Sequence, residues 1–277
     1  VDGINSVGGV AVPQLLKELG VKNIIEVNCS ADGHFAHNPE PLPENLKDIT
    51  RAVVENNADL GIVVDPDVDR LAFVDENGDM FGEEYTLVAV ADYILQNKPG
   101  NTVSNLSSTK ALRELTAQYG GTHKASAVGE VNVIQKMKEN QAVIGGEGNG
   151  GVIYPELHYG RDALVGIALF LTFLVKSDLS CSSLRERYPR YYISKNKIQL
   201  TPEVDVDKVL EQLKSDYKDL PINDEDGVKI DFDSGWVHLR KSNTEPIIRV
   251  YSEGDNKEVA DELAYGVMDT VKDLTNK

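Results

Sequence analysis

Three aspartates at a spacing of two residues form the part of this chain best suited to hold a cation. Asp65, Asp67 and Asp69 follow the apolar run 62–64, and Arg70 stands directly after them. Like charges about 4 Å apart repel by ~1 kcal/mol in water and ~4 kcal/mol at a surface-like dielectric, so an unpartnered triplet destabilises a fold. A hard divalent ion with oxygen ligands removes that repulsion. The segment therefore predicts a metal site.

Three other interpretations fit part of the same segment. A solvated acidic loop is disfavoured because apolar runs, 62–64 and 71–74, flank the aspartates on both sides. An EF-hand would use the aspartates as loop positions 1, 3 and 5, but Arg70 stands where the turn requires glycine. A phosphatase-type nucleophilic aspartate after a strand stays open on these residues alone.

The elements that position the triplet have the pattern of an α/β protein. Pro66 cannot donate to a sheet ladder, so the preceding strand should end there. Strands at 23–28 and 62–64 alternate with helices near 12–19 and 45–56, which predicts a largely parallel sheet. Ligands bind beyond the carboxyl ends of such strands, where the aspartates stand.

A second α/β segment follows from about residue 99 and contains a glycine-rich loop. The sequence GGEGNGG at 145–151 comes directly after the predicted strand 142–144. Glycines permit positive φ and close backbone approach, so this loop can wrap a small polar ligand, with Glu147 and Asn149 offering hydrogen bonds. Asp162 is placed to cap the next helix, and His158 and Arg161 precede that helix at an end that favours anions.

The third segment, from about residue 190, changes to alternating strands at hairpin spacing with two amphipathic helices. Between its last two strands lies KSNTEP at 241–246. A guanidinium, two hydroxyls and an amide gather there, which are groups that grip a phosphate dianion. The predicted phosphate-binding residues are Arg240, Ser242, Asn243, Thr244 and Arg249.

These patterns predict three domains. Residues 1–98 and 99–189 are expected to form two α/β domains with mixed, largely parallel sheets. Residues 190–277 are expected to form an α+β domain with an antiparallel sheet.

Composition narrows the class of protein. The 277 residues carry a net charge of −17 and no run of Lys or Arg, which argues against nucleic-acid and anionic-membrane partners. The longest apolar stretch, 163–175, is shorter than the ~20 residues that span a bilayer, and no signal peptide opens the chain, so a cytoplasmic location is expected. Two cysteines are too few for a disulfide framework, and His34 and His37 are interpreted as solvent-exposed or hydrogen-bonding rather than metal-binding residues.

The three loops, in this order and spacing, resemble those of the α-D-phosphohexomutase superfamily. DPDVDR at 65–70 is similar to the family's metal loop, GEGNG at 146–150 to its sugar-recognition loop and RKSNTEP at 240–246 to its phosphate-binding loop. The resemblance covers essentially the whole chain and removes the EF-hand and phosphatase interpretations. It implies three domains of a four-domain enzyme whose first domain, with the catalytic phosphoserine, is absent from this sequence. FAHNP at 35–39 is not that motif, because Ala36 stands where the serine belongs.

The resemblance also implies roles for the residues. Asp65, Asp67 and Asp69 would bind Mg²⁺, Glu147 and Asn149 sugar hydroxyls, and the third-domain loop the non-reacting phosphate. The reaction would interconvert hexose 6-phosphate and hexose 1-phosphate through a bisphosphate. Glucosamine phosphate is the expected substrate, with mannose or glucose phosphates as alternatives.

Two departures from the family pattern leave the proton-transfer groups open. Gly151 stands where many members have histidine, and Asn132 where many have lysine. Arg70, His158 and Arg161 are candidates for support of catalysis. A second hypothesis is that the chain alone is a non-catalytic module that binds sugar phosphate and Mg²⁺ and needs the first domain as its partner.

Overall fold

The computed structural model describes residues 1–40, 42–200, 204–242 and 246–275. Contacts divide the chain into two compact units, and each is described by itself. Unit 1 comprises residues 1–125 and 129–188, and unit 2 comprises residues 126–128 and 189–277. The predicted division of the first 189 residues at residues 98 and 99 stays a prediction.

The first part of unit 1 builds a strand pair that ends at the aspartates. Strands β1 (Gly61–Val64) and β2 (Leu71–Val74) are antiparallel, and both are fully buried. The accompanying helices are α1 (Gly8–Glu18), the 3₁₀ turn η1 (Pro43–Asn45) and α2 (Lys47–Glu55). The apolar face of α2 packs on β1 and β2, so a continuous core lies beneath the loop that joins the two strands.

The predicted strand at 23–28 is wrong. Only Val27 forms a bridge, parallel to Asp2, and Asp2 in turn bridges Val63 of β1. A strand needs a neighbour along its length, and the backbone bonds of this segment to residues 1–5 involve only its positions 25, 27 and 28. The rest of the segment therefore has no regular ladder among the described residues.

The second part of unit 1 is a mixed sheet in the order β4-β3-β5-β6. β3 (Thr102–Asn105) and β5 (Ile144–Glu147) are parallel, whereas β6 (Gly151–Ile153) returns antiparallel to β5. The remaining elements are β4 (His123–Ser126), α3 (Glu83–Asn97), α4 (Ala111–Gln118), α5 (Glu130–Glu139), α6 (Ala163–Ser177) and α7 (Cys181–Arg185). Mixed sheets with helices confirm the predicted α/β class.

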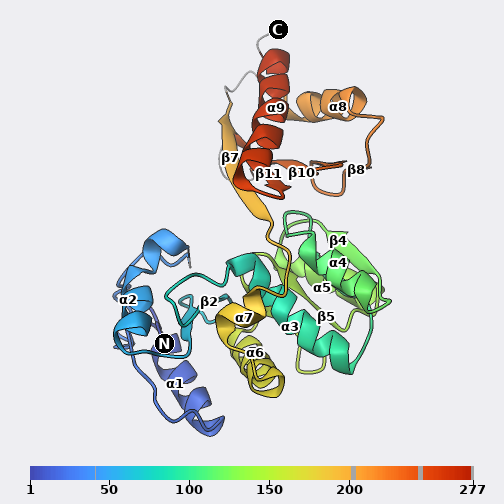
Figure 1. Cartoon of the computed structure of the whole chain (residues 1–277). Coiled ribbons are helices and arrows are strands. Elements are labelled where there is room, and N and C mark those ends of the chain that lie inside the picture. The colour runs from blue at the N-terminus through green and yellow to red at the C-terminus, as the bar shows by residue number, and fades with distance from the viewer. Residues whose placement is uncertain (41, 201–203, 243–245, 276–277) are drawn as a thin grey trace. The chain divides into compact units, whose positions relative to one another are not determined.

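Unit 2 is a five-stranded antiparallel sheet in the order β7-β11-β10-β9-β8. Its strands are β7 (Tyr192–Gln199), β8 (Ile222–Asn223), β9 (Val228–Phe232), β10 (Gly235–Lys241) and β11 (Ile247–Gly254). Helices α8 (Val206–Asp216) and α9 (Lys257–Thr275) pack on one face and form the core with it (Figure 1). This confirms the predicted antiparallel α+β segment.

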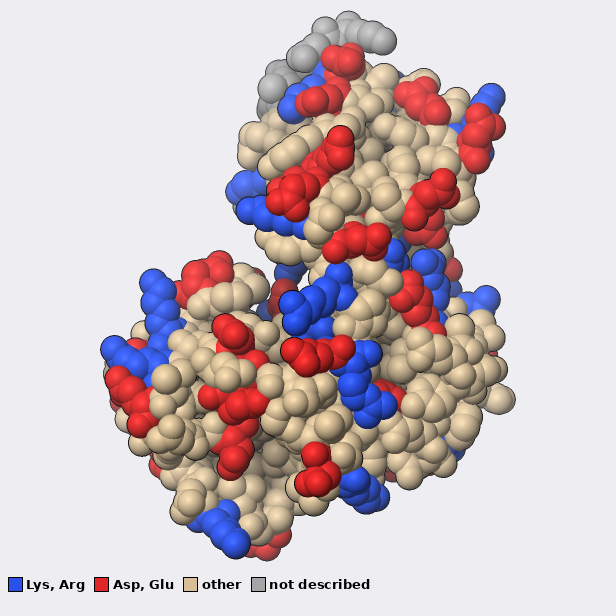
Figure 2. Space-filling view, viewed as in Figure 1, with Lys and Arg blue, Asp and Glu red and all other residues tan. Residues whose placement is uncertain are grey.

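The surface and the helices add two observations. Within the described residues, none of the helices has both the length and the apolar character to cross a membrane. On the face drawn in Figure 2, acidic side chains are spread over both units with basic ones among them. Asp and Glu outnumber Lys and Arg 45 to 28, so the drawn face has no broad basic field that would attract a polyanion.

Candidate functional site

The aspartate triplet lies on the loop between β1 and β2. Asp65 is 5% exposed, and its Oδ1 accepts hydrogen bonds from the backbone N–H of Asp69 at 3.0 Å and of Arg70 at 2.9 Å. Val68 has φ +60°, a left-handed conformation that is strained for a β-branched residue. The loop is therefore held in an unfavourable backbone shape that aims the three carboxylates together.

The charge and geometry of the triplet fit a divalent cation. One carboxylate oxygen from each of Asp65, Asp67 and Asp69 lies within 4.8 Å of the others. Burial, and then the neighbouring carboxylates, raise the pKa of Asp65 to about 7. Asp69 Oδ1 is buried and has no hydrogen-bond partner within the described residues. An oxygen-binding cation would satisfy that atom and remove the repulsion.

Three backbone contacts from distant segments fix this loop. Ser6 Oγ donates to the Pro66 carbonyl at 2.6 Å, and the Ala163 N–H donates to the Val68 carbonyl at 3.0 Å. The Leu71 N–H donates to the Gly150 carbonyl at 3.1 Å. The last contact places the glycine-rich loop beside the aspartate loop.

Close packing explains one glycine of that loop. Gly150 has φ +87°, and a Cβ there would lie 2.3 Å from the Leu71 carbonyl oxygen. Any side chain at this position would push the two loops apart, and the φ value itself disfavours other residues.

Glu147 stands at the end of β5 with its carboxylate held from several sides. It is 3% exposed, and its Oε1 accepts hydrogen bonds from Asn105 Nδ2 at 2.8 Å and from the Gly129 N–H at 3.1 Å. Asn149 is partly buried, and its Oδ1 accepts from the Gly151 N–H at 3.3 Å. Glu147 is therefore pre-oriented, whereas the Asn149 side-chain NH₂ donates to no group among the described residues.

Arg161 joins the two loops. One amino group forms a very short ion pair with Asp69 Oδ2, and the other donates to Glu147 Oε2 at 2.8 Å. Its backbone N–H donates to Glu130 Oε1 at 2.8 Å, and its side chain is only 14% exposed. Burial lowers the pKa of Arg161, but the charges of Asp69 and Glu147 outweigh it and raise the pKa above its usual value. The guanidinium stays charged and cannot act as a general acid or base.

The other candidates of unit 1 take different positions. Arg70 Nε lies 3.8 Å from Asp65 Oδ2 and 3.9 Å from Asp69 Oδ1, so its charge is beside the triplet. His158 is exposed and pairs with Asp162 Oδ2 at 2.9 Å. Asp162 caps α6, as predicted, through the Val165 N–H.

The expectation for His37 as a hydrogen-bonding residue is also confirmed, because it contacts the buried Asp2 at 3.2 Å.

Sequence reasoning missed the partners that hold Glu147 and Arg161. Asn105 ends the parallel strand β3, so the rule that ligands gather at carboxyl ends of strands would have indicated it. Glu130 begins α5 directly after Gly129, whose φ is +118°. No local pattern in the sequence pairs Glu130 with a residue 31 positions away.

Unit 2 places two basic candidates, Arg240 and Arg249, on regular strands, and a third basic residue, Lys197, beside them. Arg240 of β10 and Arg249 of β11 are directly opposite each other, and Lys197 of β7 is directly opposite Arg249. Neighbours of these residues form the helix-covered core, so by alternation all three point to the other face. The Ser242 N–H donates to the Ile247 carbonyl at 3.0 Å, whereas Asn243 and Thr244 lie outside the described residues.

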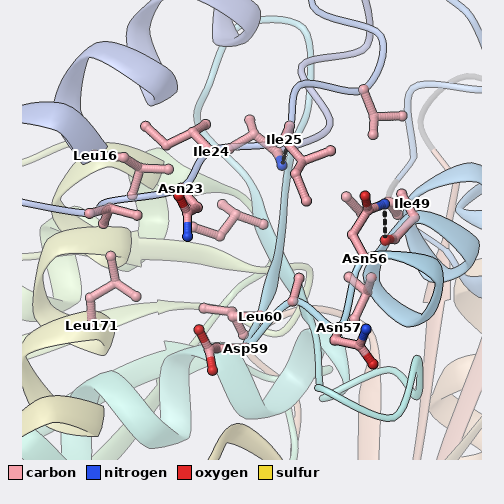
Figure 3. Close-up of a pocket in the computed structure, with 17 residues that line it drawn as sticks. Leu16, Asn23, Ile24, Ile25, Ile49, Asn56, Asn57, Asp59, Leu60 and Leu171 are labelled. Atoms are coloured by element: carbon pink, nitrogen blue, oxygen red, sulfur yellow. Dashed lines mark hydrogen bonds between the residues drawn. The ribbon is translucent and has the colours of Figure 1, made fainter.

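A separate cavity in unit 1 is not part of this arrangement. It measures about 300 Å³ and lies between α1, the 21–27 segment and α2, with Leu171 of α6 on one side (Figure 3). Its lining is mostly aliphatic, and Asp59 is the one lining residue with a charged side chain. None of the predicted site residues lines it, so the cavity offers burial rather than polar chemistry.

Comparison with known proteins gives the same order of parts. The model for Phosphoglucomutase/phosphomannomutase, alpha/beta/alpha domain II, matches residues 1–78, that for alpha/beta/alpha domain III residues 82–191, and that for the C-terminal domain residues 197–270. A phosphoglucomutase/phosphomannomutase of Thermococcus kodakarensis is 40% identical over 95% of this chain and 58% of that protein. A probable phosphoglucosamine mutase of Methanopyrus kandleri is 35% identical over 98% of this chain and 61% of that protein.

Solved structures share the fold. A phosphoglucomutase/phosphomannomutase family protein of Burkholderia thailandensis aligns with a TM-score of 0.85 at 25% identity, over 98% of this chain and 59% of that one. The N-acetylphosphoglucosamine mutase of Aspergillus fumigatus, solved with GlcNAc-6P and magnesium, aligns with a TM-score of 0.70 at 16% identity, over 98% and 64% of the two chains. The chain thus spans about three fifths of the length of the relatives it matches.

The site and the comparisons together show what kind of protein this is. Carboxylates that fit a cation lie beside a pre-oriented polar loop in an α/β unit. The chain belongs to the phosphoglucomutase/phosphomannomutase family, whose members are named as phosphomutases.

Proposed function

We propose that this chain supplies the metal, sugar and phosphate sites of a phosphohexomutase that interconverts hexose 6-phosphate and hexose 1-phosphate. The observation that carries the proposal is the contact of Arg161 with both Asp69 and Glu147, because it joins the metal loop to the sugar loop in one site. The phosphoserine of the reaction would come from a further domain of the same protein. A cytoplasmic location and the division into three domains stay part of the proposal.

The reaction is a transfer in two halves. The sugar hydroxyl at C1 or C6 attacks the phosphorus of the serine phosphate. The bond between that phosphorus and the serine oxygen breaks, and the hydroxyl proton passes to a base. The resulting bisphosphate turns over, and its other phosphoryl group returns to the serine. The sum is a reversible shift of one phosphate between C6 and C1.

Asp65, Asp67 and Asp69 would hold the metal of this reaction, and Mg²⁺ is the cation that their hard oxygen donors favour. When bound, the ion neutralises charge on the transferring phosphoryl group. Arg70 adds a fixed positive charge at the same place. The loop backbone, held by Ser6 and by the N-terminus of α6, keeps these ligands in position before the metal arrives.

Glu147 and Asn149 would orient the sugar. A carboxylate oxygen has two lone-pair sites. Both sites of Glu147 Oε1 are taken, and among the described residues Oε2 accepts from Arg161 alone, which leaves it one site. Glu147 can therefore accept one hydroxyl hydrogen bond, and Asn149 supplies the donors that a second hydroxyl oxygen needs.

Unit 2 would grip the non-reacting phosphate. Arg240, Ser242, Asn243, Thr244 and Arg249 are the proposed contacts, and the facing arginines favour bidentate bonds to phosphate oxygens. Glucosamine phosphate is the proposed hexose. Relatives named for glucosamine, mannose and glucose phosphates leave phosphomannomutase and phosphoglucomutase activity as the alternatives.

Calorimetric titration of Mg²⁺ into the EDTA-treated chain tests the metal site. We expect Asp67→Asn to bind Mg²⁺ at least tenfold more weakly than the unchanged chain, because one of three charged ligands is lost. Tenfold corresponds to ~1.4 kcal/mol. Asp59→Asn is the matched control, since Asp59 is exposed and precedes β1, whereas Asp65 follows the other end of that strand. Equal affinities for Asp67→Asn and the unchanged chain would refute the metal site.

Turnover provides the second test. The whole protein should convert glucosamine 6-phosphate in the presence of Mg²⁺, and this chain alone should not, because it lacks a serine in the phosphoserine motif. Sustained turnover by the chain alone would contradict the proposed source of the phosphoryl group.

A further inference from the structure

The Arg161 side chain occupies space that a glycine leaves for it. A Cβ on Gly151 would lie 2.4 Å from Arg161 Cδ and 3.1 Å from Cγ. Contacts below 3.0 Å require one group to move. The glycine and the arginine therefore belong together structurally: one vacates the volume through which the other reaches the loops.

The charges around Arg161 show what it does there. Its guanidinium faces the carboxylates of Asp69 and Glu147, and Glu130 Oε2 lies 3.9 Å from its Nε. Arg70 adds a second positive charge beside the triplet, with its Nε close to Asp65 and Asp69. Arg161 thus neutralises the same Asp69 carboxylate that a metal ion would bind, while it fixes Glu147 through its other amino group.

We propose that Arg161 is a positioning residue that opposes cation binding at the aspartate triplet and transmits the state of the triplet to Glu147. The inference rests on the proposed function and deepens it. A divalent cation at Asp69 is repelled by the guanidinium, and its arrival weakens the attraction that holds Arg161 to Asp69. The guanidinium then interacts more strongly with Glu147, so metal binding is coupled to the orientation of the sugar-binding carboxylate.

The geometry accounts for the choice of arginine at this position. A guanidinium presents amino groups in a fixed planar fork, so it can hold two carboxylates at once. A lysine at position 161 would keep the charge but present a single point charge to one carboxylate at a time. Replacing Arg161 by lysine therefore keeps the positive charge but removes the planar guanidinium, so the two properties can be tested separately.

Magnesium titration by calorimetry tests the charge. We expect Arg161→Gln to bind Mg²⁺ about tenfold more tightly than the unchanged chain, and Arg161→Lys to stay within about threefold of it. Gly151→Ala should also tighten binding severalfold, because its methyl group displaces the Arg161 stem, and it should add nothing in the Arg161→Gln background. Controls are Arg51→Gln, an exposed arginine paired with Asp48, and Gly266→Ala, where a Cβ meets no atom within 4 Å.

A double-mutant cycle tests the coupling to Glu147. Glu147→Gln frees Arg161 for Asp69, so it should weaken Mg²⁺ binding severalfold in the unchanged chain and less than twofold in Arg161→Lys. Far-ultraviolet circular dichroism checks that each variant folds.

The outcomes separate this inference from the proposed function. If Asp67→Asn weakens Mg²⁺ binding but Arg161→Gln does not tighten it, the inference is wrong and the metal site stands. If the effect of Glu147→Gln is the same with lysine or arginine at 161, the coupling is wrong. If Asp67→Asn has no effect, the proposed metal site itself fails.

Discussion

The aspartate triplet of unit 1 and the basic row of unit 2, defined as Lys197, Arg249 and Arg240, both gather like charges, but they do so in different ways. The triplet is on a partly buried irregular loop with a strained residue, and its neutralising arginine comes from a distant segment. The basic row uses the regular register of three adjacent strands. Like charges directly opposite on a sheet destabilise it.

The difference follows from the ligands. A small cation requires its oxygen ligands within a few ångströms, so the backbone must bring short side chains together. A phosphate is larger and can be reached by long side chains from a flat sheet. The triplet is therefore expected to be sensitive to local geometry, and the basic row mainly to charge.

The largest expected effect is on the stability of unit 2, when protonation of His238 adds a positive charge close to the basic row. His238 lies two residues before Arg240 on β10, is 2% exposed, and its Nε2 lies 2.7 Å from the Asp226 carbonyl oxygen. Burial, helped by the charges of Lys229 and Arg240 and opposed by the contact with Asp226, lowers the pKa of His238 to about 4. The unfolded chain, with a pKa near 6.5, takes up the proton first as the pH falls. Unit 2 should therefore lose about 2 kcal/mol of stability between pH 7 and pH 5.

Trp236 makes this measurable, because it is the single tryptophan of the chain and belongs to unit 2. Urea unfolding followed by its fluorescence should give a lower midpoint at pH 5 than at pH 7. His238→Gln should remove most of that difference. If His238→Gln kept the same difference between the two midpoints, groups other than His238 would control the pH dependence of stability. The basic row would then tolerate the charge of a protonated His238.

A smaller effect is expected when the row loses its central member. Arg249 has Lys197 on one side and Arg240 on the other. We expect Arg249→Gln to weaken the binding of inorganic phosphate about tenfold, since a charge-assisted hydrogen bond contributes ~1.5–3 kcal/mol. Calorimetry measures it, with Lys272→Gln of α9 as a charge-matched, exposed control. Unchanged phosphate affinity in Arg249→Gln would show that the row is not a phosphate site.

The two clusters also differ in how far the sequence predicted them. The aspartates were evident because three acids between apolar runs share one loop, and the family pattern named the loop partners. The fold class followed from the alternation of strands and helices. The strand at 23–28 was wrong because its pairing depends on residues 1–5, which the local pattern does not show. The direct contact of Asp69 with Arg161, 92 positions apart, depends on how β6 and α6 pack, and spacing alone cannot give it.

Lys197 shows the same limit, since only the strand register places it beside Arg249. Its side chain is exposed, and surface charge pairs contribute little, so its effect should be the smallest. We expect Lys197→Gln to weaken phosphate binding about threefold and to stabilise the phosphate-free chain by a few tenths of a kcal/mol, because one repulsion is removed. Lys208→Gln on α8, on the helix-covered side of the sheet, is the control for both measurements. If Lys197→Gln weakened phosphate binding as much as Arg249→Gln, long reach rather than central position would set the strength of the basic row. If it had no effect on either quantity, the row would reduce to the two arginines of β10 and β11.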